Sequence, residues 1–198
     1  YYGSLPSLDM TELPIIEIVP TPDGGGYYMV GTDGGVYAFG DARFEGSCAT
    51  IGGCGKLTVT GLLAGPNGDG YWLLLSNCTM IAFGAAPKTA DPDCQVRAVA
   101  SRAIAKEAVL TPDGQGYWAL LESGSVFAEG DAKAYGHWEA SAVPVKKVPA
   151  VALLPTRDGH GAWLVFANGK VEDLGDARPV GGLAGTKLNA PIFSAASS

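Results

Sequence analysis

Short runs of apolar residues, each interrupted by glycine, asparagine or aspartate, recur along the whole chain. In residues 22–42, PDGGGYYMVGTDGGVYAFGDA, turn-forming sequences separate stretches of strand length that are rich in aromatic and β-branched side chains. No apolar period of 3.6 residues persists through these stretches, so the pattern predicts strands rather than helices. The Asp-Gly and Asn-Gly pairs favour tight hairpin turns, which indicates a meander of antiparallel strands.

The pattern of residues 22–42 returns in three further copies, which begin at Pro66, Pro112 and Thr156. Two sets of landmarks keep in step, namely the turn residues Asp23, Asn67, Asp113 and Asp158 and the later glycines Gly40, Gly84, Gly130 and Gly175. Both sets have spacings of 44, 46 and 45 positions, which indicates one repeated unit. We therefore predict repeats at about 1–42, 43–86, 87–132 and 133–177, with 178–198 as a partial fifth repeat or a closing segment.

Each copy divides into four extended segments, which in the first copy are residues 1–5, 14–21, 26–32 and 35–40. A four-stranded meander of roughly 40–45 residues is the size of one propeller blade. The sequence therefore predicts an all-β fold, a single β-propeller domain of four to five blades over residues 1–198. A sandwich of independent hairpins is the alternative, although it does not require so regular a repeat.

Two apolar features place the segments within a blade. The second segment of each copy is the most continuously apolar, so we expect it next to the central axis. Aromatic side chains recur at one position of the third segment, and we expect them to pack between neighbouring blades: Tyr28, Trp72, Trp118 and Trp163.

The stretch TPDGGGYYMVGTDGGVYAFGDARFEGS resembles a known repeat with a GYW-L-V core and an F-G-D-A ending. That repeat occurs in tandem in secreted and cell-surface proteins of actinobacteria, some of which carry it beside cell-wall amidase or other hydrolase domains. The resemblance covers almost the whole chain and implies an interaction module. The second copy departs from the pattern, because Gly84-Ala85-Ala86 replaces Gly-Asp-Ala.

Composition narrows the possible partners. The net charge of −7 with only 13 Lys+Arg argues against a nucleic-acid groove and against docking on an anionic membrane. No apolar run approaches the ~20 residues of a spanning helix, so we expect no membrane insertion. The sequence has no initiating Met and no signal peptide, from which we expect a processed or excised chain.

Four cysteines, Cys48, Cys54, Cys78 and Cys94, allow three disulfide pairings. In an up-and-down blade, the connections between units and the turn before the last strand lie on one face, so we predict Cys48–Cys54 and Cys78–Cys94. A zinc site is the alternative, but the spacings lack the short Cys-x-x-Cys knuckle. Two disulfides indicate an oxidising compartment, so we expect an extracellular or cell-envelope location.

Repeated aspartates could form a ring that binds calcium or acts as acid and base. They are Asp23, Asp113 and Asp158 in the turns, and Asp41, Asp131 and Asp176 in the Gly-Asp-Ala motif. A ring requires every blade, yet the second copy has Asn67 and Ala85. We therefore expect these aspartates to hold turns through backbone hydrogen bonds, and we predict neither a metal nor a cofactor.

Irregular segments remain as candidate contact sites. The stretch YGHWEAS places His137, Trp138 and Glu139 where other copies have small residues, and it is the candidate binding site. The loops 48–58, 87–97 and 137–149 vary most between copies, and His160 takes a variable turn position.

These features predict a non-catalytic extracellular module that presents loops to a protein or to cell-envelope glycan. Membership of a larger assembly stays open. The alternative is a small propeller enzyme, a glycosidase-like hydrolase that uses axial carboxylates, but the sequence singles out no catalytic pair.

Overall fold

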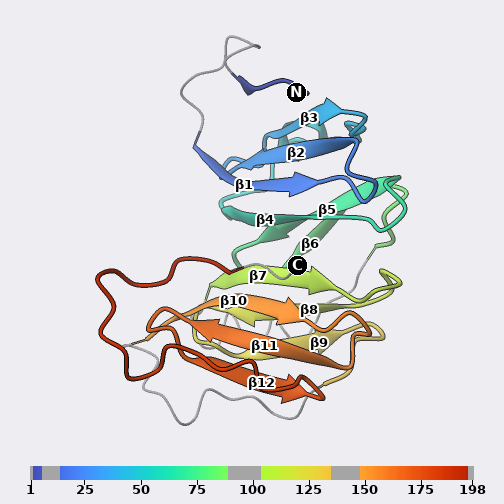
Figure 1. Cartoon of the computed structure of the whole chain (residues 1–198). Helices are drawn as coiled ribbons and strands as arrows, with labels where there is room; N and C mark the ends of the chain where they lie inside the picture. The colour runs from blue at the N-terminus through green and yellow to red at the C-terminus, as the bar shows by residue number, and fades with distance from the viewer. Residues whose placement is uncertain (1, 6–13, 89–103, 135–147, 196–198) are drawn as a thin grey trace. The chain divides into compact units, whose positions relative to one another are not determined.

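A computed structural model describes residues 2–5, 14–88, 104–134 and 148–195. The described chain is an all-β structure of four three-stranded antiparallel sheets, each a meander of consecutive strands (Figure 1). It divides into two compact units, residues 1–91 and 92–198, with two sheets in each. The prediction of a single domain over 1–198 stays a prediction.

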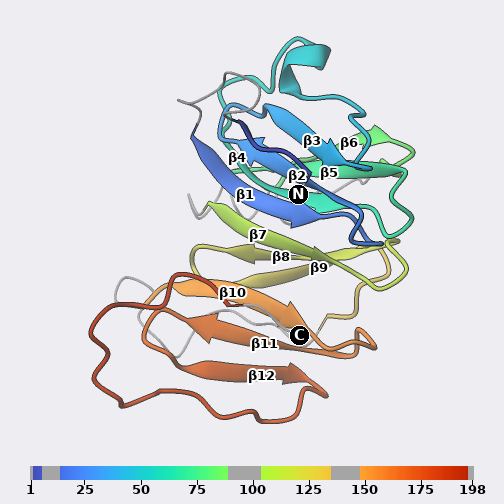
Figure 2. The same cartoon turned by 45° about the horizontal axis from the view of Figure 1, so that its top comes forward.

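Unit 1 contains two sheets and a short 3-10 helix, η2 (Cys48–Ile51), in the connection between them (Figure 2). Sheet 1 consists of β1 (Ile15–Pro20), β2 (Gly26–Gly31) and β3 (Val36–Gly40). Sheet 2 consists of β4 (Val59–Ala64), β5 (Gly70–Leu75) and β6 (Met80–Gly84).

Unit 2 repeats this arrangement. Sheet 3 consists of β7 (Ala105–Leu110), β8 (Tyr117–Leu121) and β9 (Val126–Glu129). Sheet 4 consists of β10 (Ala150–Pro155), β11 (Gly161–Phe166) and β12 (Val171–Gly175). The predicted positions of three strands in every copy are thus confirmed.

The predicted fourth strand is wrong where the structure describes it, because residues 2–5 and 44–47 contain no strand. In these segments Gly3 and Gly46 have φ angles of +125° and +143°, which interrupt an extended ladder. Each segment is instead held by a tyrosine hydroxyl, which donates to the carbonyl oxygen of Gly3 from Tyr27 and to that of Gly46 from Tyr71. The segments therefore lie along their sheets without joining them.

The first strand of every sheet has a β-bulge at the same position. The register shifts between Ile15 and Glu17 in β1 and at the matching sites in β4, β7 and β10. In unit 1, the Glu17 carboxylate accepts a hydrogen bond of 2.8 Å from the backbone N–H of Leu62 in β4. In unit 2, Glu107 binds the N–H of Leu153 in β10 at 2.9 Å.

Apolar packing joins the two sheets within unit 1. One core cluster contains Tyr28 and Val30 of sheet 1 together with Tyr71 and Leu73 of sheet 2. The rings of Tyr28 and Tyr71 lie 5.1 Å apart. The prediction that the recurrent aromatics pack between sheets is confirmed for Tyr28, whose side chain is fully buried.

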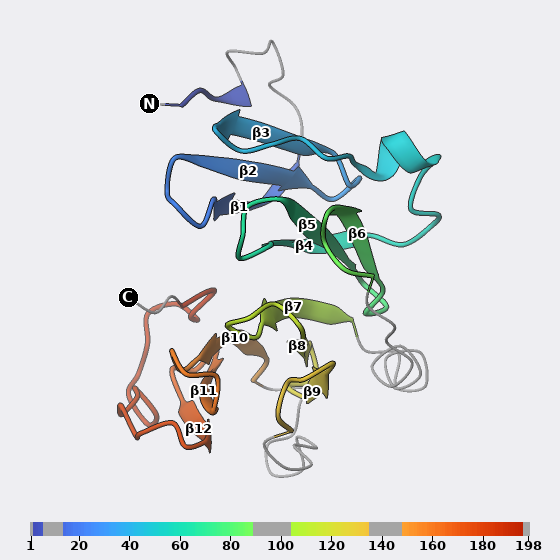
Figure 3. The same ribbon diagram turned by 90° about the vertical axis from the view of Figure 1, so that its right-hand side faces the viewer.

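In unit 2, the residues that follow β12 cover sheet 4 (Figure 3). Ile192 and Ala195 pack against a cluster that includes Val165 and Ala167, and the N–H of Ile192 donates to the carbonyl of Ala167 at 2.8 Å. Residues 178–195 contain no strand. The prediction that residues 178–198 are a partial fifth repeat or a closing segment stays a prediction.

The structure contains the disulfide Cys48–Cys54, as predicted, with the two Cα atoms 5.2 Å apart. Cys48 is buried against Gly34 in the β2–β3 turn, where a β-carbon would overlap the cysteine sulfur. The second predicted pair, Cys78–Cys94, involves Cys94, which lies outside the described residues. The disulfide therefore closes the 48–58 loop on itself, and the hydrogen bond from the N–H of Cys48 to the carbonyl of Gly34 holds this loop at the end of sheet 1.

Candidate functional site

The turn between the first two strands of sheets 1 and 3 is organised around one threonine hydroxyl. In sheet 1, the Thr21 hydroxyl accepts a hydrogen bond of 2.9 Å from the N–H of Gly26. The same oxygen lies 2.8 Å from Asp23 Oδ1 and 3.3 Å from Asp41 Oδ1. In sheet 3, the matching distances from Thr111 are 2.9, 2.8 and 3.1 Å.

The turn aspartates also accept hydrogen bonds from the backbone two residues further on. Asp23 accepts from Gly25 N–H, Asp113 from Gln115 N–H and Asp158 from His160 N–H, each at 3.1 Å. These contacts confirm that the turn aspartates hold the turns. Sheet 2 lacks the whole set, because Gly65, Asn67 and Ala85 occupy the three positions.

Hydrogen bonding also lowers the pKa values of the turn aspartates. The N–H of Gly25 is the main cause of the lowered pKa of Asp23, and the N–H of Gln115 plays the same role for Asp113. For Asp158 the main cause of the lowered pKa is the Thr156 hydroxyl. A glycosidase general acid requires the opposite direction, a raised pKa, so these carboxylates are suited to accept hydrogen bonds rather than to donate protons.

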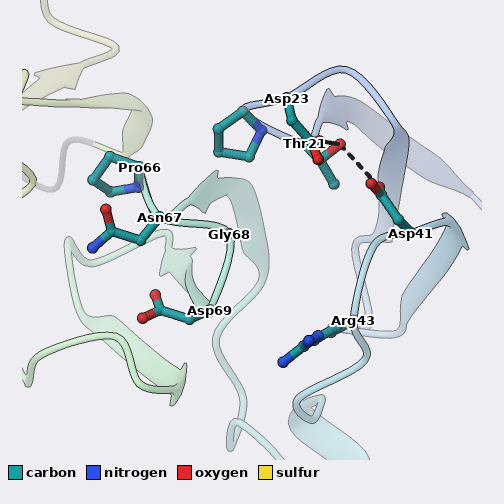
Figure 4. Close-up of a pocket in the computed structure, with 9 residues that line it drawn as sticks. Thr21, Asp23, Asp41, Arg43, Pro66, Asn67, Gly68 and Asp69 are labelled. Atoms are coloured by element: carbon teal, nitrogen blue, oxygen red, sulfur yellow. Dashed lines mark hydrogen bonds between the residues drawn. The ribbon is translucent and has the colours of Figure 1, made fainter.

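A polar pocket of about 500 Å³ opens in unit 1 between the turns of its two sheets (Figure 4). Sheet 1 contributes Thr21, Pro22, Asp23, Asp41 and Arg43, and sheet 2 contributes Pro66, Asn67, Gly68 and Asp69. The volume falls within the range of small-molecule sites. The pocket therefore depends on the packing of sheet 1 against sheet 2.

The lining supplies both donors and acceptors of hydrogen bonds. Asp23, Asp41 and Asp69 provide carboxylate oxygens, and Asn67 provides an amide. Arg43 provides five N–H donors, and its guanidinium takes part in none of the ion pairs among the described residues. Two prolines add apolar surface at the edge. Such a set can bind the hydroxyl groups of a polar ligand from several directions.

The residues predicted from the sequence as a binding site, His137, Trp138 and Glu139, lie outside the described residues. Of the three predicted loops, 48–58 is described, and it lies at the end of sheet 1 that carries the β2–β3 turn. The pocket lies at the other end, beside the β1–β2 turn. The sequence does not indicate this pocket, because Arg43 and Asp69 come together only through the contact between two sheets.

No family model and no curated protein matches the sequence. Among solved structures, the chain is similar to the β-propeller domain of Cps50 (Swd1) from Myceliophteria thermophila, with 12% identity and a TM-score of 0.49. The match covers 85% of this chain, and this chain spans 55% of that one. In the described parts of the structure, no helix has the length and hydropathy needed to cross a membrane.

Proposed function

We propose that the protein is a non-catalytic extracellular binding module, built as a small β-propeller whose blades are the four sheets. Its ligand is a polyhydroxylated one, a glycan of the cell envelope, and it binds in the pocket between the turns of sheets 1 and 2. Three features support the propeller. They are the four copies of one meander, the bulge repeated in each first strand, and the packing of β1 on β4 and of β7 on β10.

The pocket carries the proposal of glycan binding. Carboxylate, amide and guanidinium groups converge on one opening from two sheets, and this arrangement suits a ligand with several hydroxyls, each of which both donates and accepts. The lowered pKa of Asp23 keeps its carboxylate ionised as an acceptor, which favours binding over hydrolysis. The Cys48–Cys54 disulfide and the resemblance to a repeat of secreted proteins support the extracellular location.

Binding to arrayed glycans and to isolated cell-wall fragments tests the proposal. We expect Arg43→Gln and Asp69→Asn to weaken the affinity about tenfold each, which corresponds to about 1.4 kcal/mol. Arg178→Gln is the matched control, because Arg178 is the exposed residue at the equivalent position after sheet 4. Equal binding by all variants would place the ligand elsewhere, and no binding to any glycan or wall fragment would refute the partner class.

A further inference from the structure

A second group of side chains lies in unit 2 and is independent of the proposed function. Asp158 and His160 belong to the β10–β11 turn, and Asp176 follows β12. One potential ligand atom from each of these residues lies within 4.8 Å of the others. His160 Nδ1 is 3.5 Å from Asp158 Oδ2. The three side chains therefore gather at one exposed corner of sheet 4.

The histidine makes this corner different from the equivalent corners. The position of His160 is occupied by Gly25 in sheet 1 and by Gln115 in sheet 3. In those sheets the motif aspartate accepts a hydrogen bond from the threonine hydroxyl, as Asp131 does from Thr111. In sheet 4, the Thr156 hydroxyl contacts the turn aspartate Asp158 and the carbonyl of Gly161, as its counterparts do in sheets 1 and 3, but it makes no hydrogen bond to Asp176 among the described residues.

Two carboxylate oxygens are consequently available beside the imidazole ring. The hydrogen bonds of Asp158 from Thr156 and from the His160 N–H use Oδ1, while Oδ2 is the atom nearest the ring. Among the hydrogen bonds of the described residues, none reaches the Asp176 carboxylate. One nitrogen atom and two oxygen atoms that can act as metal ligands thus lie close together.

We propose that Asp158, His160 and Asp176 form a binding site for a divalent transition-metal ion such as Zn²⁺. Imidazole selects such ions over Ca²⁺ and Mg²⁺, which prefer all-oxygen ligands. Ligand atoms on a tetrahedral Zn²⁺ lie about 2.0–2.2 Å from the metal and hence about 3.3–3.6 Å from one another. The exposed side chains reach this spacing by small rotations, and water fills the remaining coordination positions.

Each ligand has a replacement that occurs naturally elsewhere in the chain, so the variants keep the turn. Asp158→Asn reproduces Asn67, Asp176→Ala reproduces Ala85, and His160→Gln reproduces Gln115. Calorimetric titration of tag-free, metal-stripped protein with Zn²⁺ or Ni²⁺ should give one site per chain. We expect each replacement to weaken that site about tenfold or more, because it removes one of three ligands. His137→Gln, which changes the only other histidine, should leave it intact.

A gain of function tests the same geometry in sheet 3, where Asp113 and Asp131 already flank Gln115. Because the Thr111 hydroxyl already binds Asp131 Oδ1, we expect Gln115→His to add a second site that is weaker than the site in sheet 4. Binding that His160→Gln leaves unchanged, or that His137→Gln abolishes, would overturn the proposal. Because the pocket lies in unit 1, glycan binding should be the same in the His160→Gln variant. The metal proposal and the glycan proposal can therefore fail independently of each other.

Discussion

At the scale of single residues, a threonine hydroxyl holds the turns together with the aspartates that surround it. Thr21 and Thr111 are each only 7% exposed, and each hydroxyl binds a buried glycine N–H as well as two carboxylates. The sequence indicated the aspartates, because Asp and Gly are recognised turn residues. The sequence did not indicate the threonine. Its role depends on the approach of Asp41, which lies 20 positions later in the chain than Thr21.

Replacement of Thr111 by valine should therefore destabilise unit 2. Valine has a similar shape but leaves the Gly116 N–H buried without its acceptor, for which we expect a loss of about 1–3 kcal/mol in the free energy of unfolding. Urea denaturation followed by tryptophan fluorescence measures this loss. Thr111→Ser is the control, since it keeps the hydroxyl. A valine variant as stable as the serine variant would show that the hydroxyl contributes little.

At the scale of elements, a contact between neighbouring first strands links the two sheets of each unit. Glu17 and Glu107 cross from one first strand to a backbone N–H of the next, at the β-bulge. The strands themselves were predictable from their apolar patterns and turn sequences. The bulge and the crossing carboxylate were not, because nothing in a local pattern shows which N–H is left without a partner inside its own sheet.

The Glu17 contact should depend on pH in a defined direction. Burial is the main cause that raises the pKa of the Glu17 carboxyl above 4.5, since desolvation disfavours the charged form. The stability that this carboxyl contributes is thus fully present below pH 4.5 and is lost as the pH rises through its higher folded pKa. Relative to Glu17→Gln, the wild-type protein should gain stability when the pH falls from neutral to 4.5.

Urea unfolding of both proteins at the two pH values measures the difference directly. Other carboxylates titrate in both proteins, so their contributions cancel in the comparison. A difference in free energy of unfolding that stays constant with pH would contradict the assigned cause.

At the scale of the whole molecule, four repeats, antiparallel meanders and one disulfide could be predicted from the chain alone. The repeated turn residues and glycines are determined by local structure, so the predicted strands lie where the structure has them. The sequence does not show that the outer segments lack strands, because Gly3 and Gly46 stand in runs of extended pattern, whereas their positive φ angles take the backbone out of the ladder. The pocket and the division into two units depend on contacts between sheets, which no repeat pattern contains.

The C-terminal segment of unit 2, residues 178–195, provides a test at this scale. Ile192 packs on sheet 4, while its neighbour Phe193 is 78% exposed. We expect Ile192→Asp to release the segment and to destabilise unit 2 by about 1–2 kcal/mol, because apolar area on both partners returns to water. Limited proteolysis and binding of a hydrophobic dye detect the release. Phe193→Asp should behave like the wild type; a similar effect of both variants would argue against specific packing.

The crossing glutamates alternate along the array: Glu17 and Glu107 occupy positions where sheets 2 and 4 have Gly61 and Ala152. A sheet whose glutamate accepts this hydrogen bond is therefore followed by a sheet whose backbone N–H donates it, so the two sheets form a pair. A protein of this kind should accordingly be lengthened or shortened by two sheets at a time. An odd number would leave a glutamate carboxylate without the backbone N–H that donates to it.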